Sequence, residues 1–186
     1  LFKDKESLEL IEIIFPQLKN INRFKKLNSY ANNNLFKIDF IFLLSLMIID
    51  GTDNTDYFLY KFNISKKDQK RLKEINFFYK EKINIKNFTE KNFNKILYFS
   101  GRQTVIDIIN FKLFTSIKVE KKLIRLMKIY KDKLIPIMPI GANMLMTKFN
   151  MAEGKALGNK LRMIEEIWVN NGFNISEKQI QKVAES

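Results

Sequence analysis

Apolar residues recur every three or four positions along most of the chain, which is the spacing of one face of a helix. From Ser7 to Phe15 this spacing predicts a helix that Pro16 ends, because proline inside a helix removes a hydrogen bond and clashes with the preceding turn. The apolar positions between residues 18 and 27 predict a second helix. The three asparagines at 32–34 are expected to break the pattern before the next helix.

The most apolar stretch, residues 35–50, predicts a central helix buried in the core, with Gly51 as its C-terminal cap. Lys37 and Asp39 lie near the start of this stretch. The apolar run after Asp39 is shorter than the roughly 20 residues that a helix needs to cross a bilayer. We therefore expect a core helix and no membrane partner.

Two later helices carry an N-terminal signal. Ser65 stands three residues before Asp68, and Thr89 precedes another apolar run, so both are expected to cap the start of a helix. Gly101 is expected to end the helix that follows Thr89. The apolar runs that predict these helices and two more cover residues 72–79, 93–97, 105–111 and 123–130.

A connector is predicted at residues 134–141, because Pro136 and Pro139 exclude a helix interior there. It separates an expected body domain, residues 1–133, from a smaller lobe, residues 134–186. No segment alternates apolar and polar residues between tight-turn signals, so no sheet is predicted. The predicted fold is all-α, an irregular multi-helix body with a small helical C-terminal lobe.

The chain contains neither cysteine nor histidine. This composition excludes disulfides, thiolate nucleophiles, thiolate or histidine zinc sites and histidine-based catalysis. Residues 50–56 carry three aspartates, but at every third position, whereas a calcium loop uses alternate positions and a closing glutamate. A solvated turn that leads into a helix fits this segment better. We predict no catalytic residue, no metal ligand and no cofactor in this chain.

The formal net charge of +13 favours a polyanionic partner such as nucleic acid. Arginine is rare, however, while lysine, asparagine and isoleucine are abundant, a bias that AT-rich coding also produces. Charge alone therefore leaves the partner open. The chain begins with Leu1, without an initiator methionine or a signal-peptide pattern, so we expect it to start inside a longer, cytoplasmic protein.

Two of the predicted helices carry clusters of basic residues. In the first cluster, Lys70, Arg71 and Lys73 are candidate RNA contacts of the kind that bind phosphates without regard to sequence. A solvated helix face explains the same pattern, so both interpretations stay open. The two clusters are Lys66, Lys67, Lys70, Arg71 and Lys73, and Lys118, Lys121, Lys122, Arg125 and Lys128.

The chain is also rich in aromatic residues. Most of them fall at helical core spacing, so we predict core packing and not base stacking for them. Trp168 is expected to close the apolar face of the last long helix. The other aromatic residues in this group are Phe77, Phe78, Tyr79, Phe93, Tyr98, Phe99, Phe111 and Phe114.

Small and basic residues gather at the start of that last long helix. Gly154 and Gly158 stand four residues apart, and Lys155, Lys160 and Arg162 lie close by. The exposed amides of a first helical turn favour an anion, so an RNA phosphate is the predicted ligand of these five residues. Alternatively, or in addition, the glycines let two helices pack closely.

One string of residues runs through this helix: Gly154-x-x-x-Gly158-x-x-Leu161-x-x-x-Glu165-x-x-Trp168. With the proline-bearing connector before it and a glycine-phenylalanine pair after it, the string resembles the tail of class II CCA-adding enzymes and bacterial poly(A) polymerases. Asn150 stands where that family often has glycine, an exchange that suits a left-handed backbone. Residues 64–72 and 15–18 resemble upstream segments of the same family.

The resemblance implies a parent enzyme that adds CCA, or A residues, to RNA 3′ ends from nucleoside triphosphates with two metal ions. In that family the catalytic motifs belong to an N-terminal head, which binds Mg²⁺ and the triphosphate, and none of those motifs is present here. This chain is then a non-catalytic body and tail that hold tRNA, or another RNA, by its shape and backbone. Its partners are the RNA and the enzyme's own catalytic domain. The alternative is a helical protein-interaction scaffold whose charge reflects coding bias alone.

Overall fold

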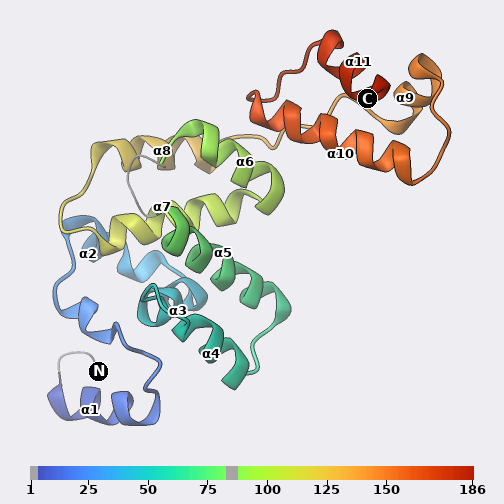
Figure 1. The fold of residues 1–186 in the computed structure, drawn as a ribbon. Coiled ribbons are helices and arrows are strands. Elements are labelled where there is room, and N and C mark those ends of the chain that lie inside the picture. Colours follow the sequence, from blue (N-terminus) through green and yellow to red (C-terminus); the bar gives the residue numbers. More distant parts are fainter. Residues whose placement is uncertain (1–3, 83–87) are drawn as a thin grey trace. The chain divides into compact units, whose positions relative to one another are not determined.

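The computed structural model describes residues 4–82 and 88–186, and within them every regular element is a helix (Figure 1). The predicted all-α fold is confirmed. No helix in this part of the chain combines the length and apolar character that crossing a membrane requires. In chain order the α-helices are α1 (Lys5–Ile14), α2 (Ser29–Asn34), α3 (Phe40–Ile48), α4 (Asn54–Lys61), α5 (Lys66–Lys82), α6 (Glu90–Ser100), α7 (Arg102–Thr115), α8 (Lys121–Asp132), α9 (Ala142–Phe149), α10 (Lys155–Asn170) and α11 (Glu177–Glu185).

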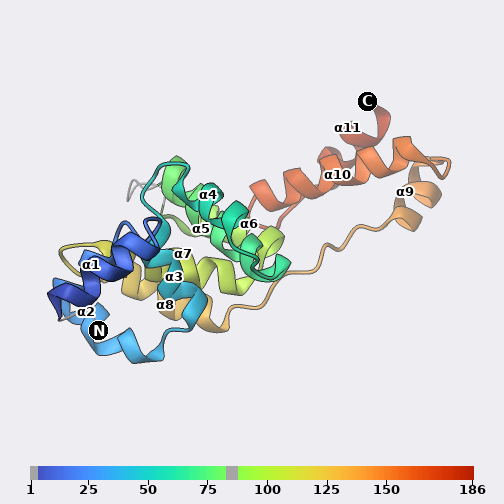
Figure 2. The same ribbon diagram turned by 90° about the horizontal axis from the view of Figure 1, so that it is seen from below.

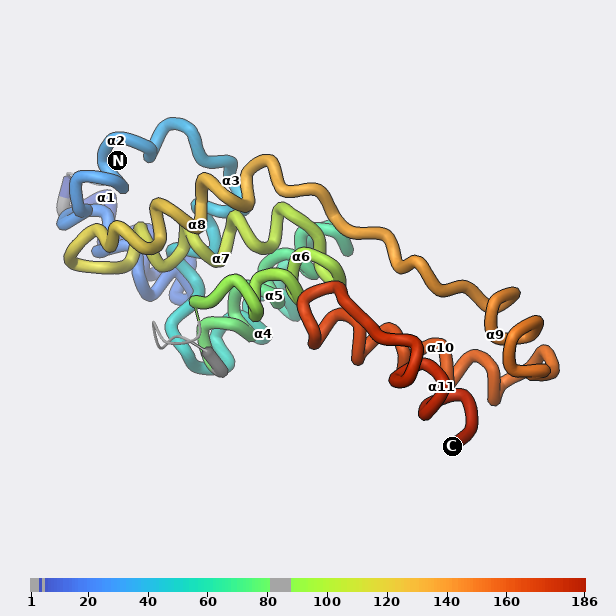
Figure 3. Tube along the Cα trace, turned by 90° about the horizontal axis from the view of Figure 1, so that it is seen from above, coloured from blue at the N-terminus to red at the C-terminus, as the bar shows by residue number. Residues whose placement is uncertain are grey.

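The chain forms two compact units. One division between them falls where the predicted connector begins, and residues 133–141 are indeed not helical. The predicted body domain, residues 1–133, includes α6, whereas in the structure α6 belongs with the C-terminal helices, because it packs against α10 (Figure 3). The first unit comprises Leu1–Phe88 and Arg102–Lys133, and the second comprises Thr89–Gly101 and Leu134–Ser186.

Helix α3 lies at the centre of the first unit, between α4, α5 and α7 (Figure 2). Its sequence is apolar on every side, which suits a helix that neighbours surround. Six of its nine residues are buried. The core cluster around it contains Phe42, Leu44, Leu46, Met47, Ile48, Leu72, Ile75, Phe111 and Phe114 among others.

The central helix begins later than residues 35–50 predict. A carboxylate oxygen of Asp39 accepts a hydrogen bond from the Phe42 amide at 3.0 Å, which makes Asp39 the N-terminal cap. Residues 35–37 form a separate 3-10 turn. Gly51 is not the C-terminal cap, which is Ile49. Its φ of +86° and its closeness to the Tyr79 ring instead require glycine in the turn that follows.

Two further predictions near the N-terminus are wrong. The asparagine run forms α2, because Asn28 caps that helix by accepting a hydrogen bond from the Ala31 amide at 2.9 Å. The Asn28 side chain also donates to the carbonyl oxygens of Leu113 and Ser116, both at 2.7 Å, and thereby ties α2 to the end of α7. Residues 21–25 form a 3-10 helix in place of the predicted α-helix over 18–27.

Several local signals are confirmed. Helix α1 ends before Pro16, and Ser65 and Thr89 each accept a hydrogen bond from an amide in the first turn of α5 and α6. Helix α6 ends at Gly101, which has a φ of +87°. Asn150 ends α9 with a left-handed backbone, φ 51° and ψ 37°, as its glycine-like position predicts.

Helix α10 is the centre of the second unit, where α6, α9 and α11 pack against it. Trp168 is buried, and its ring lies 5.4 Å from that of Tyr98 and 5.0 Å from that of Phe173. The Tyr98 hydroxyl donates a hydrogen bond to Glu165, and burial together with this carboxylate raises the pKa of Tyr98 to about 12. Glu165 and Trp168 therefore fix α10 to α6.

Candidate nucleic-acid interface

Helix α10 begins at a backbone conformation that only glycine adopts readily. Gly154 has a φ of +150° and a ψ of −171°. Glycine has no side chain, so this N-cap residue of the described structure cannot accept a hydrogen bond from the amides of the first turn. The amides of residues 155–157 and the positive end of the helix dipole therefore favour an anion.

The second glycine of the pair has no packing role. A Cβ atom built on Gly158 or on Gly154 meets no heavy atom within 4 Å, so the prediction that the glycines allow close helix packing is wrong. Glycine inside a helix costs roughly 1 kcal/mol relative to alanine. At Gly158 nothing within the unit offsets that cost. The bare backbone instead leaves an exposed strip of α10 open to approach from outside.

Two exposed basic residues border this open strip. Lys155, Gly158 and Arg162 stand at helical spacings of three and four, so they share one face of α10. Arg162 Nε lies 3.6 Å from Glu166 Oε1, but both side chains are largely exposed, and ion pairs between exposed side chains contribute little to stability. Lys160 differs from its neighbours, because it is half-buried and donates to the Ser186 hydroxyl at 2.8 Å.

A second basic surface runs along α5. Lys66, Lys70 and Lys73 line a shallow hollow of about 690 Å³, which Phe77 closes at one end. Phe77 is 60% exposed, so the prediction that it packs in the core is wrong, and the same holds for Phe99. The structure thus brings lysines and an aromatic ring together where the sequence predicted lysines alone.

Arg71 does not belong to this surface, although its place among the lysines of the first basic cluster predicted that it would. Its guanidinium donates to both carboxylate oxygens of Asp39 and to both of Asp107, and only 17% of its side chain is exposed. Burial opposes its charge, but these hydrogen bonds outweigh that effect and raise the pKa of Arg71. Burial would likewise raise the pKa of Asp39, yet the bonds from Arg71 and from the Phe42 amide hold it below its ordinary value. Arg71 therefore links α3, α5 and α7 and is not free to bind an RNA phosphate.

Helix α8 carries the other predicted basic cluster. Its apolar residues Leu123 and Leu126 are buried, and Lys121, Arg125 and Lys128 on the remaining face are exposed. This division is the ordinary one for a surface helix. It leaves the positive charge available to a partner, but Tyr130, the aromatic residue of this helix, is buried. In the part of the chain that the structure describes, the first amides of α8 lack a side-chain cap, as those of α10 do.

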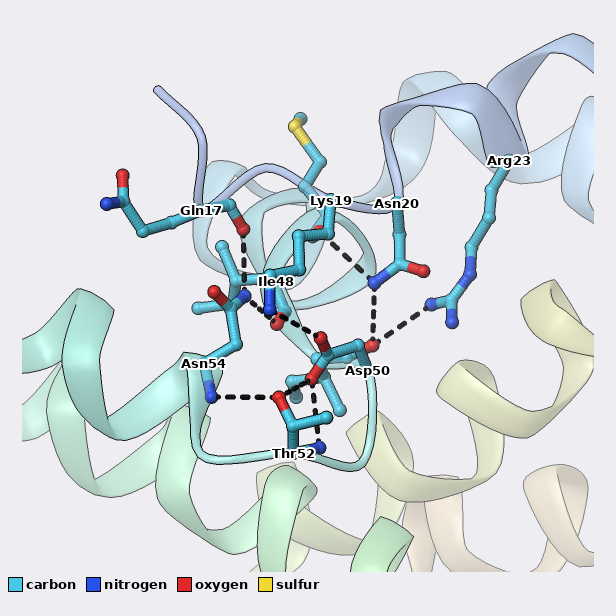
Figure 4. A network of polar contacts seen from close by, with 10 residues as sticks. Gln17, Lys19, Asn20, Arg23, Ile48, Asp50, Thr52 and Asn54 are labelled. Atoms are coloured by element: carbon cyan, nitrogen blue, oxygen red, sulfur yellow. Dashed lines mark hydrogen bonds and ion pairs between the residues drawn. The ribbon is translucent and has the colours of Figure 1, made fainter. Parts of the chain in front are cut away.

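The polar turn between α3 and α4 is structural (Figure 4). The Asn20 side chain donates to the carbonyl oxygen of Ile49 at 3.0 Å, and Asp50 pairs with Lys19 at 3.3 Å. Burial alone would raise the pKa of Asp50, but hydrogen bonds from Thr52 and the charge of Lys19 hold it below its ordinary value. Among the described residues no three acidic side chains cluster as a metal site would require.

No family model, curated protein or solved structure matches the chain. The candidate interface therefore depends on its own geometry. It comprises two basic surfaces, one on each unit, and the surface on α10 adds uncapped amides and an unexplained glycine. Such groups bind phosphate oxygens.

Proposed function

We propose that this chain binds RNA by its sugar-phosphate backbone, as the non-catalytic body and tail of a tRNA nucleotidyltransferase or poly(A) polymerase. In this proposal the chemistry, with its Mg²⁺ ions and nucleoside triphosphate, belongs to a separate catalytic domain of the same enzyme. The RNA partner is tRNA or a similarly folded RNA, which is held by shape and charge. The parent activity rests on the sequence resemblance, and the RNA contact rests on the surface of α10.

The observation that carries the proposal is Gly158. It lies in the exposed first turns of α10, where glycine makes the helix less stable than alanine would. No neighbouring atom of the described chain lies close enough to exclude a side chain at this position. Lys155 and Arg162 flank it on the same face, and the uncapped amides lie one turn away. A phosphate backbone that approaches the helix closely accounts for all of these features together.

The test is the substitution Gly158→Ala, measured by thermal unfolding and by titration of labelled tRNA at low salt. Alanine is expected to stabilise the helix by about 1 kcal/mol, because glycine is the poorer helix former. The added methyl group keeps the RNA backbone away from α10, so tRNA affinity is expected to fall roughly tenfold, as the loss of one charge-assisted hydrogen bond does.

The matched control is Asn159→Ala, which changes the neighbouring exposed residue and leaves the Gly158 backbone bare. We expect tRNA affinity to stay unchanged in this control. A Gly158→Ala chain that binds tRNA as well as the unsubstituted chain does would refute the role of the α10 surface.

A protein-interaction scaffold is the second candidate, and an apolar groove in the first unit favours it. The groove has a volume of about 330 Å³, and Phe40 on its wall is 70% exposed. Exposed apolar surfaces of this kind are typical of protein docking faces. Its lining residues are Phe15, Leu18, Phe40, Leu44, Met47, Phe58, Phe62 and Ile64.

The two candidates differ in a single titration. A scaffold without an RNA role predicts only the non-specific attraction of a basic chain to tRNA at low salt, which Gly158→Ala does not weaken. The RNA-binding proposal predicts measurable affinity that the uncharged substitution Phe40→Ala leaves unchanged, because Phe40 does not line the basic hollow on α5.

A further inference from the structure

Helix α5 places three lysines and one aromatic ring in a single row. Lys66, Lys70, Lys73 and Phe77 follow one another at helical spacings of four, three and four. At 1.5 Å of rise per residue the row is roughly 16 Å long. All four side chains are exposed, and together they line the shallow hollow of about 690 Å³.

The exposure of Phe77 has no explanation within the fold. Its neighbour Phe78 is 5% exposed and packs in the core against Phe88. The Phe77 ring, in contrast, stacks on no other ring among the described residues. An exposed aromatic ring beside lysines offers two things at once, a flat surface for a base and cations for the attached phosphates. Single-stranded RNA is bound in this way.

The two ends of the row differ in charge. Lys66 lies in the first turn of α5, where the helix dipole adds to its positive charge, and no described carboxylate pairs with any of the three ammonium groups. Glu74, three residues before Phe77 on the helix, also lines the hollow. Its negative charge disfavours a phosphate there and so favours a base over the backbone.

We infer that the α5 row binds a short unpaired stretch of RNA, with phosphates along Lys66, Lys70 and Lys73 and one base stacked on Phe77. This inference rests on the proposed RNA-binding function and adds to it a single-stranded ligand at a second surface. The stacking contact tolerates any base, because every base has a flat face.

The test uses the full chain and a labelled single-stranded RNA of about eight nucleotides, titrated by fluorescence anisotropy over a range of salt concentrations. Phe77→Ala is expected to lower the affinity about tenfold without changing the slope of log K against log salt, because stacking releases no counterion. Phe77→Trp is expected to restore or raise the affinity. The double substitution Lys70→Ala and Lys73→Ala is expected to flatten the slope by about 1.4, since each phosphate contact on a single strand contributes about 0.7.

Phe36→Ala is the matched control, because Phe36 is 98% exposed in the same unit but does not line the hollow. We expect it to leave the affinity unchanged, and we expect Phe77→Ala to leave the affinity for fully paired RNA unchanged. The inference is overturned if Phe77→Ala binds the single strand as well as the unsubstituted chain, or if Phe36→Ala weakens binding equally. If either result is found while Gly158→Ala still weakens tRNA binding, the α5 inference is wrong but the proposed RNA-binding function is not contradicted. If the unsubstituted chain binds no RNA at low salt, both fall.

Discussion

Adjacent residues on α5 show that positive charge in a sequence has two different uses. Lys70 is exposed in the basic hollow, where its ammonium group meets water or a ligand. Arg71, one position further, turns inward and is held by Asp39 and Asp107. Asp107 is 1% exposed, so its charge depends on Arg71 for compensation.

Arg71→Ala is therefore expected to destabilise the chain by about 3 kcal/mol or more, because it leaves the buried Asp107 carboxylate without a positive charge, with the Gln103 side chain as its remaining hydrogen-bond donor. Lys70→Ala removes an exposed charge and is expected to change stability by less than about 0.5 kcal/mol. Urea unfolding followed by circular dichroism measures both. Equal stability of the two variants would mean that the guanidinium has no structural role.

The sequence predicted neither the inward turn of Arg71 nor the exposure of Phe77. Asp107 lies 36 positions from Arg71, so no local pattern reveals the pair. Phe77 and Phe78 are adjacent and chemically identical, and only the direction of α5 relative to α3 and α7 decides which ring is buried. The residue types predicted a basic surface on α5, but the packing of the helix decides which of its basic side chains are exposed.

At the scale of elements, helix ends were predictable where the capping group lies within a few residues of the end. Ser65, Thr89 and Asn150 satisfy backbone groups or angles in their own turn, so the sequence around them carries the whole signal. Helix α2 was missed because its stability comes partly from Asn28, whose side chain reaches Leu113, 85 positions away. Its six residues are too few for a stable isolated helix.

Asn28→Ala is expected to cost about 2 kcal/mol, since it removes the cap of α2 and two hydrogen bonds to the end of α7. Asn28→Ser keeps a capping oxygen but is too short to reach α7, so an intermediate loss is expected. Asn33→Ala, at an exposed position in the same run, serves as control and is expected to be neutral within about 0.5 kcal/mol. Chemical denaturation gives all three values, and a neutral Asn28→Ala would show that α2 does not depend on this anchor.

At the scale of the whole molecule, two of the apolar clusters among the described residues lie in different units. The first is built around α3, and the second consists of apolar residues from α9, α10, α11 and the connector. The connector was predictable from its two prolines, but the membership of α6 was not, because contacts with residues far along the chain, such as those of Tyr98 with Glu165 and Trp168, assign it to the second unit. Each unit carries one of the two proposed RNA-binding surfaces.

The two compact units are expected to unfold in two transitions, and the single tryptophan of the chain is expected to follow only one of them. Trp168 lies in the second unit, so its fluorescence follows that unit, whereas circular dichroism follows the helices of both. Leu46→Ala empties space in the first core and is expected to cost about 3 kcal/mol. Its circular dichroism transition should move to lower denaturant concentration while the Trp168 fluorescence transition stays in place. Leu145→Ala, in the second core, is the matched variant and should shift the fluorescence transition. If Leu46→Ala shifts both signals together, the two units unfold as one cooperative block, and substitutions at one RNA-binding surface must then be checked for their effect on the other.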